Sequence, residues 1–246
     1  MSGDEATPRV HGEAGTPRQR LRLTLRVPAS TAPGDRPSGA RAWSEALLRA
    51  GLPVVLAPGG GHPRVTLAAA LPLGISGERE IVDVFLAERL PVAEVRTRLV
   101  AELPSDVELV GIHDVWLGAP AAPAAVRAAE YRVEAAGATA TAVRAAAAGL
   151  LAARSLPRER RREKRATTYD LRPLLDRLEV GPWDDDAPGG PAGVLRMRLR
   201  HAPEAVGRPD EVLAALAEAV GSRLEARSIV RERVILEGEP DGGPGE

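Results

Sequence analysis

The stretch LRLTLRV at residues 21–27 decides the fold class, because its apolar and polar residues alternate strictly. Alternation with a period of two is typical of a strand that buries one face. Further along, Trp43, Ala46, Leu47 and Ala50 recur with the spacing of a helix face, and Gly51 stands where glycine commonly ends a helix. The sequence therefore opens with a strand followed by a helix.

The strand alternation and the helical spacing of apolar residues both recur in the rest of the first half. Further strands are predicted over residues 53–56, 65–71, 81–87 and 107–117. A second helix is predicted over 91–103, with Pro91 at the position that proline favours in a first turn. The resulting order, β-α-β-β-β-α-β, indicates a ferredoxin-like split βαβ unit with one extra strand or a long hairpin.

The pattern restarts after a segment rich in Ala and Pro. Strands are predicted over 131–135, 174–180, 194–199 and 225–236, and helices over 139–155 and 209–220. The fold class is therefore α+β, with two tandem ferredoxin-like halves that have antiparallel sheets. The predicted boundaries are a disordered tail at 1–18, half 1 at 19–118, a linker at 119–128, half 2 at 129–237 and a disordered tail at 238–246.

Composition narrows the chemistry. The 246 residues include no Cys, which excludes disulfides, thiolate zinc sites and cysteine-ligated iron–sulfur clusters. The net charge of -1 argues against a protein that coats nucleic acid non-specifically, although local basic patches remain. No signal segment or membrane span is apparent, so a cytoplasmic location is expected, with no membrane partner. No residue pattern indicates a cofactor or a metal site.

Several short segments carry a family resemblance. They are residues 49–53 (RAGLP), 62–65 (HPRV), 71–75 (LPLGI), 129–131 (AEY) and 164–173 (KRATTYDLRP). In this order they resemble the radical SAM-linked, or radical SAM-associated, bacterial proteins of unknown function. The resemblance runs from about residue 21 to 236. It implies an accessory role near RNA or cofactor modification, with a separate radical SAM enzyme as a partner, and no established reaction.

The chain also departs from that family pattern, as a divergent stand-alone member would. The Ser-His-Leu-Asp segment that usually opens the first helix is replaced by PASTAPGD at residues 28–35. Of the Gly-Phe-Asn-Pro-His-Pro segment, only His62 and Pro63 persist, after three glycines. If the family has a polar site between those two loops, this chain keeps half of it.

Two basic segments are candidates for nucleic-acid binding. Residues 158–165 hold six basic side chains in eight, and arginine forks suit phosphate groups. The alternative is a solvated helix extension or loop with internal Glu–Arg pairs. Arg196, Arg198 and Arg200 alternate with apolar residues and so share one strand face, which suits single-stranded RNA or, alternatively, a solvated face. The candidate contacts are Arg160, Arg161, Arg162, Lys164, Arg165, Arg196, Arg198 and Arg200.

The remaining candidates are the polar residues of the family segments. His62, beside Pro63 and Arg64, is a weak candidate for an acid or base, and the alternative is a surface turn. Tyr169, Asp170 and Arg172 suit a stacking and charged site, although Asp170 near Pro173 is better explained as a turn or cap residue. The acidic run at 184–186 is interpreted as a solvated loop because no ligand pattern follows it.

Three functions remain open from the sequence. The first is a non-catalytic accessory or RNA-binding module that works with an RNA- or cofactor-modification system. The second is an enzyme with a cleft between the halves that uses His62. The third is a protein–protein adaptor for a separate radical SAM enzyme. No nucleophile–base pair is visible, so catalysis is the less favoured class, and radical SAM chemistry cannot occur in a chain without Cys.

Overall fold

A computed structural model describes residues 15–30, 40–59, 61–162, 165–202 and 205–239. These residues form a mixed α+β architecture with mostly antiparallel strand pairs and few helices. The chain divides into two compact units. Unit 1 takes the described residues within 1–28, 32–70 and 80–124, and unit 2 takes those within 29–31, 71–79 and 125–246. The predicted tails fall mainly on residues 1–14 and 240–246, which lie outside the described residues.

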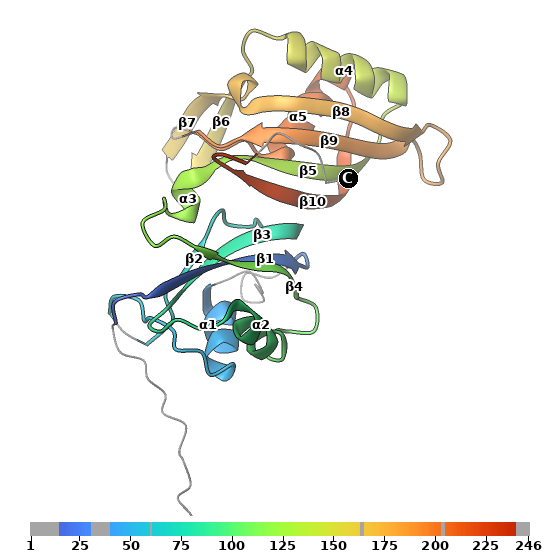
Figure 1. Ribbon diagram of the computed structural model, residues 1–246. Helices are drawn as coiled ribbons and strands as arrows, with labels where there is room; N and C mark the ends of the chain where they lie inside the picture. The colour runs from blue at the N-terminus through green and yellow to red at the C-terminus, as the bar shows by residue number, and fades with distance from the viewer. Residues whose placement is uncertain (1–14, 31–39, 60, 163–164, 203–204, 240–246) are drawn as a thin grey trace, which may run out of the picture. The chain divides into compact units, whose positions relative to one another are not determined.

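Unit 1 has the element order β-α-β-β-α-β. Its sheet has the order β4-β1-β3, with β2 paired to the outer side of β3, and β1 runs antiparallel to β4. Helices α1 and α2 lie on the same side of this sheet (Figure 1). The bounds are β1 Gln19–Val27, α1 Ala40–Arg49, β2 Val65–Leu67, β3 Ile75–Leu86, α2 Val92–Val100 and β4 Glu108–Val115.

The alternation at the start of the chain builds the core of unit 1. Leu21, Leu23 and Leu25 are buried on β1, and Leu99 of α2 is buried as well. Burial of one such side chain contributes about 2 kcal/mol. Gly51 follows α1 with a φ of 61°, a conformation that only glycine adopts readily. The predicted strand at 53–56 is reduced to isolated bridges, Val54 with Leu86 and Leu56 with Pro63.

Unit 2 contains a four-stranded antiparallel sheet of order β10-β5-β9-β8, and residues 75–77 of β3 pair in parallel with β10. Its strand β5 begins inside the segment predicted as a linker, just after the short helix α3. The bounds are α3 Ala122–Ala125, β5 Val126–Ala136, α4 Ala140–Ala152, β6 Pro157–Arg162, β7 Arg165–Asp170, a 3-10 turn η1 Arg172–Leu174, β8 Leu175–Asp184, β9 Ala192–Arg200, α5 Pro209–Val220 and β10 Glu225–Leu236.

Helices α4 and α5 cover one face of the unit 2 sheet (Figure 1). Val133 of β5, Leu195 of β9 and Leu216 of α5 are fully buried between them. Helix α4 is capped by Thr139, whose hydroxyl accepts a hydrogen bond from the amide of Ala142. The other sheet face carries charged residues, so the strands of this unit separate an apolar side from a polar one.

One element of unit 2 differs from the expectation. Residues 157–162 and 165–170 pair as two antiparallel strands, the β6–β7 hairpin, in place of a helix extension or loop. The basic residues carry no apolar alternation, so sequence periodicity gives no strand signal there. Backbone pairing supplies the order, from Pro157 opposite Asp170 to Arg162 opposite Arg165. This hairpin is what positions the candidate site.

Candidate functional site

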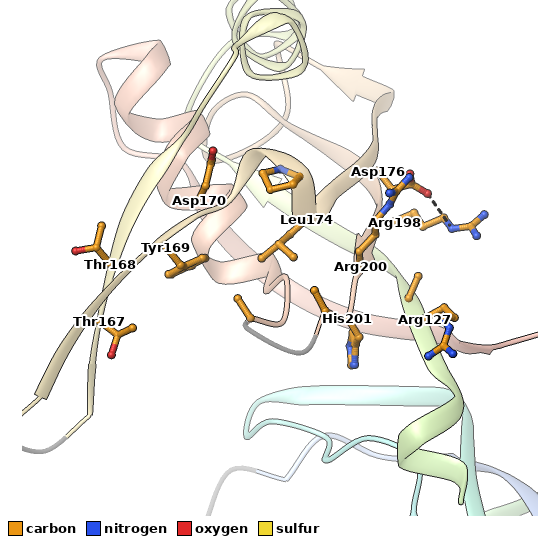
Figure 2. Close-up of a pocket in the computed structure, with 14 residues that line it drawn as sticks. Arg127, Thr167, Thr168, Tyr169, Asp170, Leu174, Asp176, Arg198, Arg200 and His201 are labelled. Atoms are coloured by element: carbon orange, nitrogen blue, oxygen red, sulfur yellow. Dashed lines mark hydrogen bonds and ion pairs between the residues drawn. The ribbon is translucent and has the colours of Figure 1, made fainter. Parts of the chain in front are cut away.

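A cavity of about 930 Å³ lies in unit 2, between the β6–β7 hairpin and the end of β9 (Figure 2). Strand β7 supplies Thr167 and Thr168 on one side of it, and Arg127 at the start of β5 lies on the other. Its apolar lining comes from the η1 turn and from the segment after β9, through Pro173, Leu174, Ala202 and Ala205. The cavity therefore has one apolar wall, and its other walls are polar.

The arginine alternation of β9 is present as predicted, with Leu195, Met197 and Leu199 buried on the opposite face. Each of the three arginines has an acidic partner. Arg196 lies 3.3 Å from Glu232, while Arg198 and Arg200 share the carboxylate of Asp176 at 3.2 and 2.5 Å. Arg198 and Arg200 line the cavity, and Arg196 does not. The stripe is thus an ion-paired face whose distal end opens onto the cavity.

The basic hairpin adjoins the same cavity through β7. Arg160, Arg161, Arg162 and Arg165 occupy positions in its strands, but their side chains lie outside the described part, as does Lys164 altogether. Arg158, at the base of β6, lies 2.9 Å from Glu218. The hairpin that carries the basic segment and the strand that carries the arginine stripe therefore both line one pocket, the hairpin through residues 167–170 and the strand through Arg198 and Arg200.

Sequence reasoning missed several polar residues of the cavity, among them Arg127, Asp176 and His201. The His201 amide donates to the carbonyl of Arg127 at 2.8 Å, and the His201 Nε2 is buried with no hydrogen-bond partner in the described part of the chain. Burial, together with the nearby charge of Arg231, lowers the pKa of His201 to about 4. The imidazole is therefore neutral near pH 7. Its position directly after the β9 arginines was the only available signal.

Tyr169 and Asp170 both line the cavity. The Tyr169 hydroxyl is hydrogen-bonded to the Glu211 carboxylate, which leaves the ring as its contribution to the wall. Asp170 accepts hydrogen bonds from the amides of Leu156 at 2.7 Å and Arg172 at 2.9 Å. These bonds, the one from Leu156 first, lower the pKa of Asp170. Asp170 thus organises the turn after the hairpin.

The Arg172 guanidinium also has a structural role, because it binds backbone carbonyls. Its guanidinium donates to the carbonyl of Leu151 at 2.8 and 3.1 Å and to that of Leu175 at 2.9 Å. These bonds tie the η1 turn to the end of α4 and the start of β8. The family segment at 169–172 therefore has its polar groups committed to holding one wall of the cavity in place.

The family segment that contains His62 belongs to unit 1 and does not line this pocket. His62 is exposed, and its carbonyl accepts a hydrogen bond from the amide of Ala57 at 2.9 Å. Pro63 is buried and bridges to Leu56, and the Arg64 guanidinium stacks over the Phe85 ring at 4.1 Å. Among the described contacts, none joins the His62 ring to a carboxylate or a nucleophile. These contacts describe a turn held by its backbone.

Metal chemistry receives no support from the described residues, since they contain no group of three or more His, Asp or Glu that could hold an ion. In the acidic run, Asp185 accepts a hydrogen bond from the amide of Ala140 at 2.6 Å and so caps α4. Asp184 accepts one from the amide of Asp186 at 2.9 Å. No described helix has the length and apolarity that a bilayer crossing requires.

Comparisons with known proteins place the chain in a family and in a fold. Residues 39–209 match the family described as "uncharacterized protein conserved in bacteria". No curated protein matches. Among solved structures, the chain resembles a chain in the crystal structure of a Cbf5–Nop10–Gar1 complex, with a TM-score of 0.51 and 11% identity. The match covers 87% of this chain and 48% of that one, so this chain spans about half the length of its structural relative.

Proposed function

We propose a non-catalytic, RNA-binding accessory function for this chain, which belongs to the DUF2344 family of uncharacterized proteins conserved in bacteria. The single observation that carries the proposal is that the hairpin with the basic segment, through residues 167–170, and Arg198 and Arg200 of β9 line the same pocket. Arginine clusters bind nucleic acid by neutralising phosphates, and the bound protein positions the strand without breaking a bond. The candidate contacts remain Arg160, Arg161, Arg162, Lys164, Arg165, Arg196, Arg198 and Arg200.

The ion pairs of β9 are compatible with this role. Arg196 and Arg200 are 53% and 59% exposed, and exposed ion pairs contribute only about 0–1 kcal/mol. A phosphate can therefore replace Asp176 as a partner of Arg200 at low cost. The hairpin adds net positive charge, because its segment 158–165 has six basic and two acidic residues.

The finer architecture is part of the same proposal. In each unit the strands immediately before and after the second helix flank the first strand, and both helices lie on one face of the sheet. We infer that both are split βαβ units of the ferredoxin-like kind, the second with the β6–β7 hairpin inserted. Such units leave a sheet face open, and RNA-binding modules commonly use that face. The resemblance to radical SAM-linked proteins adds a separate radical SAM enzyme as the partner that performs the chemistry.

A salt titration of RNA binding tests the function. Fluorescence anisotropy with a labelled 12-nucleotide RNA should show binding that weakens linearly on a log–log plot against salt, by about 0.7 per phosphate contact for a single strand. The triple substitution R160Q/R161Q/R162Q should weaken binding at least about tenfold and lower the slope by about 2. Absence of binding by the unaltered protein at about 20 mM salt would overturn the proposal.

A matched control separates a local surface from overall charge. Arg26, Arg49 and Arg98 are exposed arginines of unit 1 with acidic partners Glu108, Glu102 and Glu94. The triple substitution R26Q/R49Q/R98Q removes the same charge, and we expect it to change affinity less than about twofold. Equal losses in both triple variants would mean that only net charge matters, and the hairpin would then have no special role.

A further inference from the structure

The pocket of unit 2 is larger and more apolar than phosphate contacts alone require. At about 930 Å³ it falls within the range of about 300–1,000 Å³ typical of small-molecule sites. Pro173 and Leu174 of the η1 turn give it an apolar wall, and the Tyr169 ring stands beside them. A phosphate oxygen gains nothing from such a wall, whereas a planar ring does. The pocket is therefore shaped for a ligand with an apolar, flat body.

The charge of the pocket favours an anionic group on that ligand. Arg127, Arg198 and Arg200 all line it. Arg127 pairs with Glu237 at 2.5 Å, and because both side chains are exposed, a phosphate can replace Glu237 at low cost. Its two carboxylates are already engaged, Asp170 by backbone amides and Asp176 by Arg198 and Arg200 together. One carboxylate shared by two guanidinium groups leaves an excess of positive charge at this end of the pocket.

A third feature distinguishes the pocket from an ordinary surface hollow. The Nε2 atom of His201 is buried and has no hydrogen-bond partner among the described residues. A buried polar atom without a partner carries a free-energy cost, and a ligand or water that pairs with it removes that cost. An uncharged imidazole can exchange hydrogen bonds with the edge of a base in the way that a charged one cannot.

We propose that this pocket takes up one unstacked nucleotide, with the base against Pro173, Leu174 and Tyr169 and the phosphate on Arg200. His201 pairs with the edge of the base, and Arg127 adds charge at the phosphate end. This inference rests on the proposed RNA-binding function, in which the nucleotide belongs to an RNA strand that the β6–β7 hairpin holds. A free nucleoside monophosphate has the same chemistry, and the experiment separates the two sources.

Isothermal titration calorimetry with uridine and adenosine 5′-monophosphates tests the pocket directly. Both should bind at least about tenfold more tightly than inorganic phosphate or the nucleoside, because base and phosphate are both recognised. R200Q should weaken nucleotide binding about tenfold. R177Q is the matched control, since Arg177 lies on the neighbouring strand β8, is as exposed as Arg200, pairs with Glu179 and lies outside the pocket. Equal losses in R177Q and R200Q would overturn the inference.

A substitution that leaves the charge unchanged separates the pocket from the phosphate-binding surface. A202F places a ring into the lining, and thermal unfolding verifies that this variant folds. The inference predicts loss of nucleotide binding and a weakening of RNA binding of about tenfold, with an unchanged salt slope. If the unaltered protein binds RNA, while A202F binds RNA equally well and no mononucleotide binds, the pocket inference fails and the proposed function stands. If mononucleotides bind and RNA does not, the source is the free nucleotide and the proposed function fails.

Discussion

Arg20 and Asp83 are both buried in unit 1, and their charged atoms lie 2.5 Å apart. The Asp83 carboxylate also accepts hydrogen bonds from Arg22, and the Arg20 guanidinium donates to the carbonyls of Ala119 and Pro120 at 2.8 Å. One buried carboxylate therefore pairs with two arginines of β1, and one of those arginines also binds the carbonyls of the chain that leaves β4. This cluster fixes the connection at the end of unit 1.

Removal of that carboxylate should be costly. D83N leaves the charges of Arg20 and Arg22 without a buried counter-charge, and breaking a buried pair typically costs about 3–5 kcal/mol. We expect a loss of that size in the free energy of unfolding, measured by urea titration with circular dichroism. The control is E108Q, which breaks the exposed pair with Arg26 and should cost less than about 1 kcal/mol. Similar losses in both variants would show that the buried position adds nothing.

Asp170 gives a second prediction, which concerns how its contribution to the free energy of unfolding depends on pH. D170A removes the acceptor of the Leu156 and Arg172 amides, so we expect a loss of about 1 kcal/mol at pH 7, as for other capping carboxylates. Because the folded-state pKa of Asp170 is lowered, its charge stabilises the fold above the unfolded pKa of about 4, and that contribution is lost as pH falls through the folded value.

The measurement for Asp170 is the difference in unfolding free energy between wild type and D170A as a function of pH. The difference should be constant above about pH 5 and shrink below it. D186A serves as the control, because Asp186 lies in the exposed loop of the acidic run. A difference that stays constant down to low pH would contradict the charged role of Asp170 in the turn.

Sequence periodicity predicted the elements that are held by apolar burial. The alternation on β1 and β9 follows from the burial of one strand face, and the glycine after α1 follows from a positive φ. Both features depend on neighbouring residues, so the sequence alone reveals them. Arg20 shows where this reasoning ends. Arg20 lies on the polar face of β1, yet it is 2% exposed because it pairs with Asp83 of β3. A partner from a distant strand leaves no mark in the local pattern.

The candidate site was predictable in part for the same reason. Arg198, Arg200, Tyr169 and Asp170 were singled out, and all four line the pocket. Their convergence depends on the β6–β7 hairpin, which is built by backbone pairing among basic residues and carries no apolar signal. His201 was missed because its burial depends on contacts from β5 and β10, more than 25 residues away in either direction.

His201 makes the stability of the protein depend on pH in a defined window. Its pKa is about 4 in the folded state and about 6.5 when unfolded, so the unfolded chain binds the proton first as the solution is acidified. Stability is therefore complete above about pH 6.5 and falls toward pH 4. Between pH 7 and 5 the loss from this residue is at most about 2 kcal/mol, and about 1 kcal/mol after allowance for its partial exposure.

Urea titrations at pH 7 and pH 5 isolate this contribution. H201Q should lose about 1 kcal/mol less than wild type between the two values, since glutamine has no proton to gain. H113Q, at an exposed histidine of β4, should lose as much as wild type. A pH dependence that is the same in H201Q and wild type would show that the imidazole is not held neutral by the fold.

Asp176 offers a test in which binding should improve. Its carboxylate is the shared partner of Arg198 and Arg200 at the mouth of the pocket, and it competes there with any phosphate. D176N frees both guanidinium groups, so we expect RNA affinity to rise about two- to fivefold and the salt slope to steepen by about 0.7, which corresponds to one more phosphate contact. The matched control is E179Q, at an exposed β8 residue that pairs with Arg177 at 3.6 Å and lies outside the pocket. Its effect on the slope should be smaller than that of D176N, because the arginine it frees does not line the pocket. Anisotropy titrations at four salt concentrations give both quantities, and weaker RNA binding by D176N would show that these arginines serve the sheet and not a phosphate.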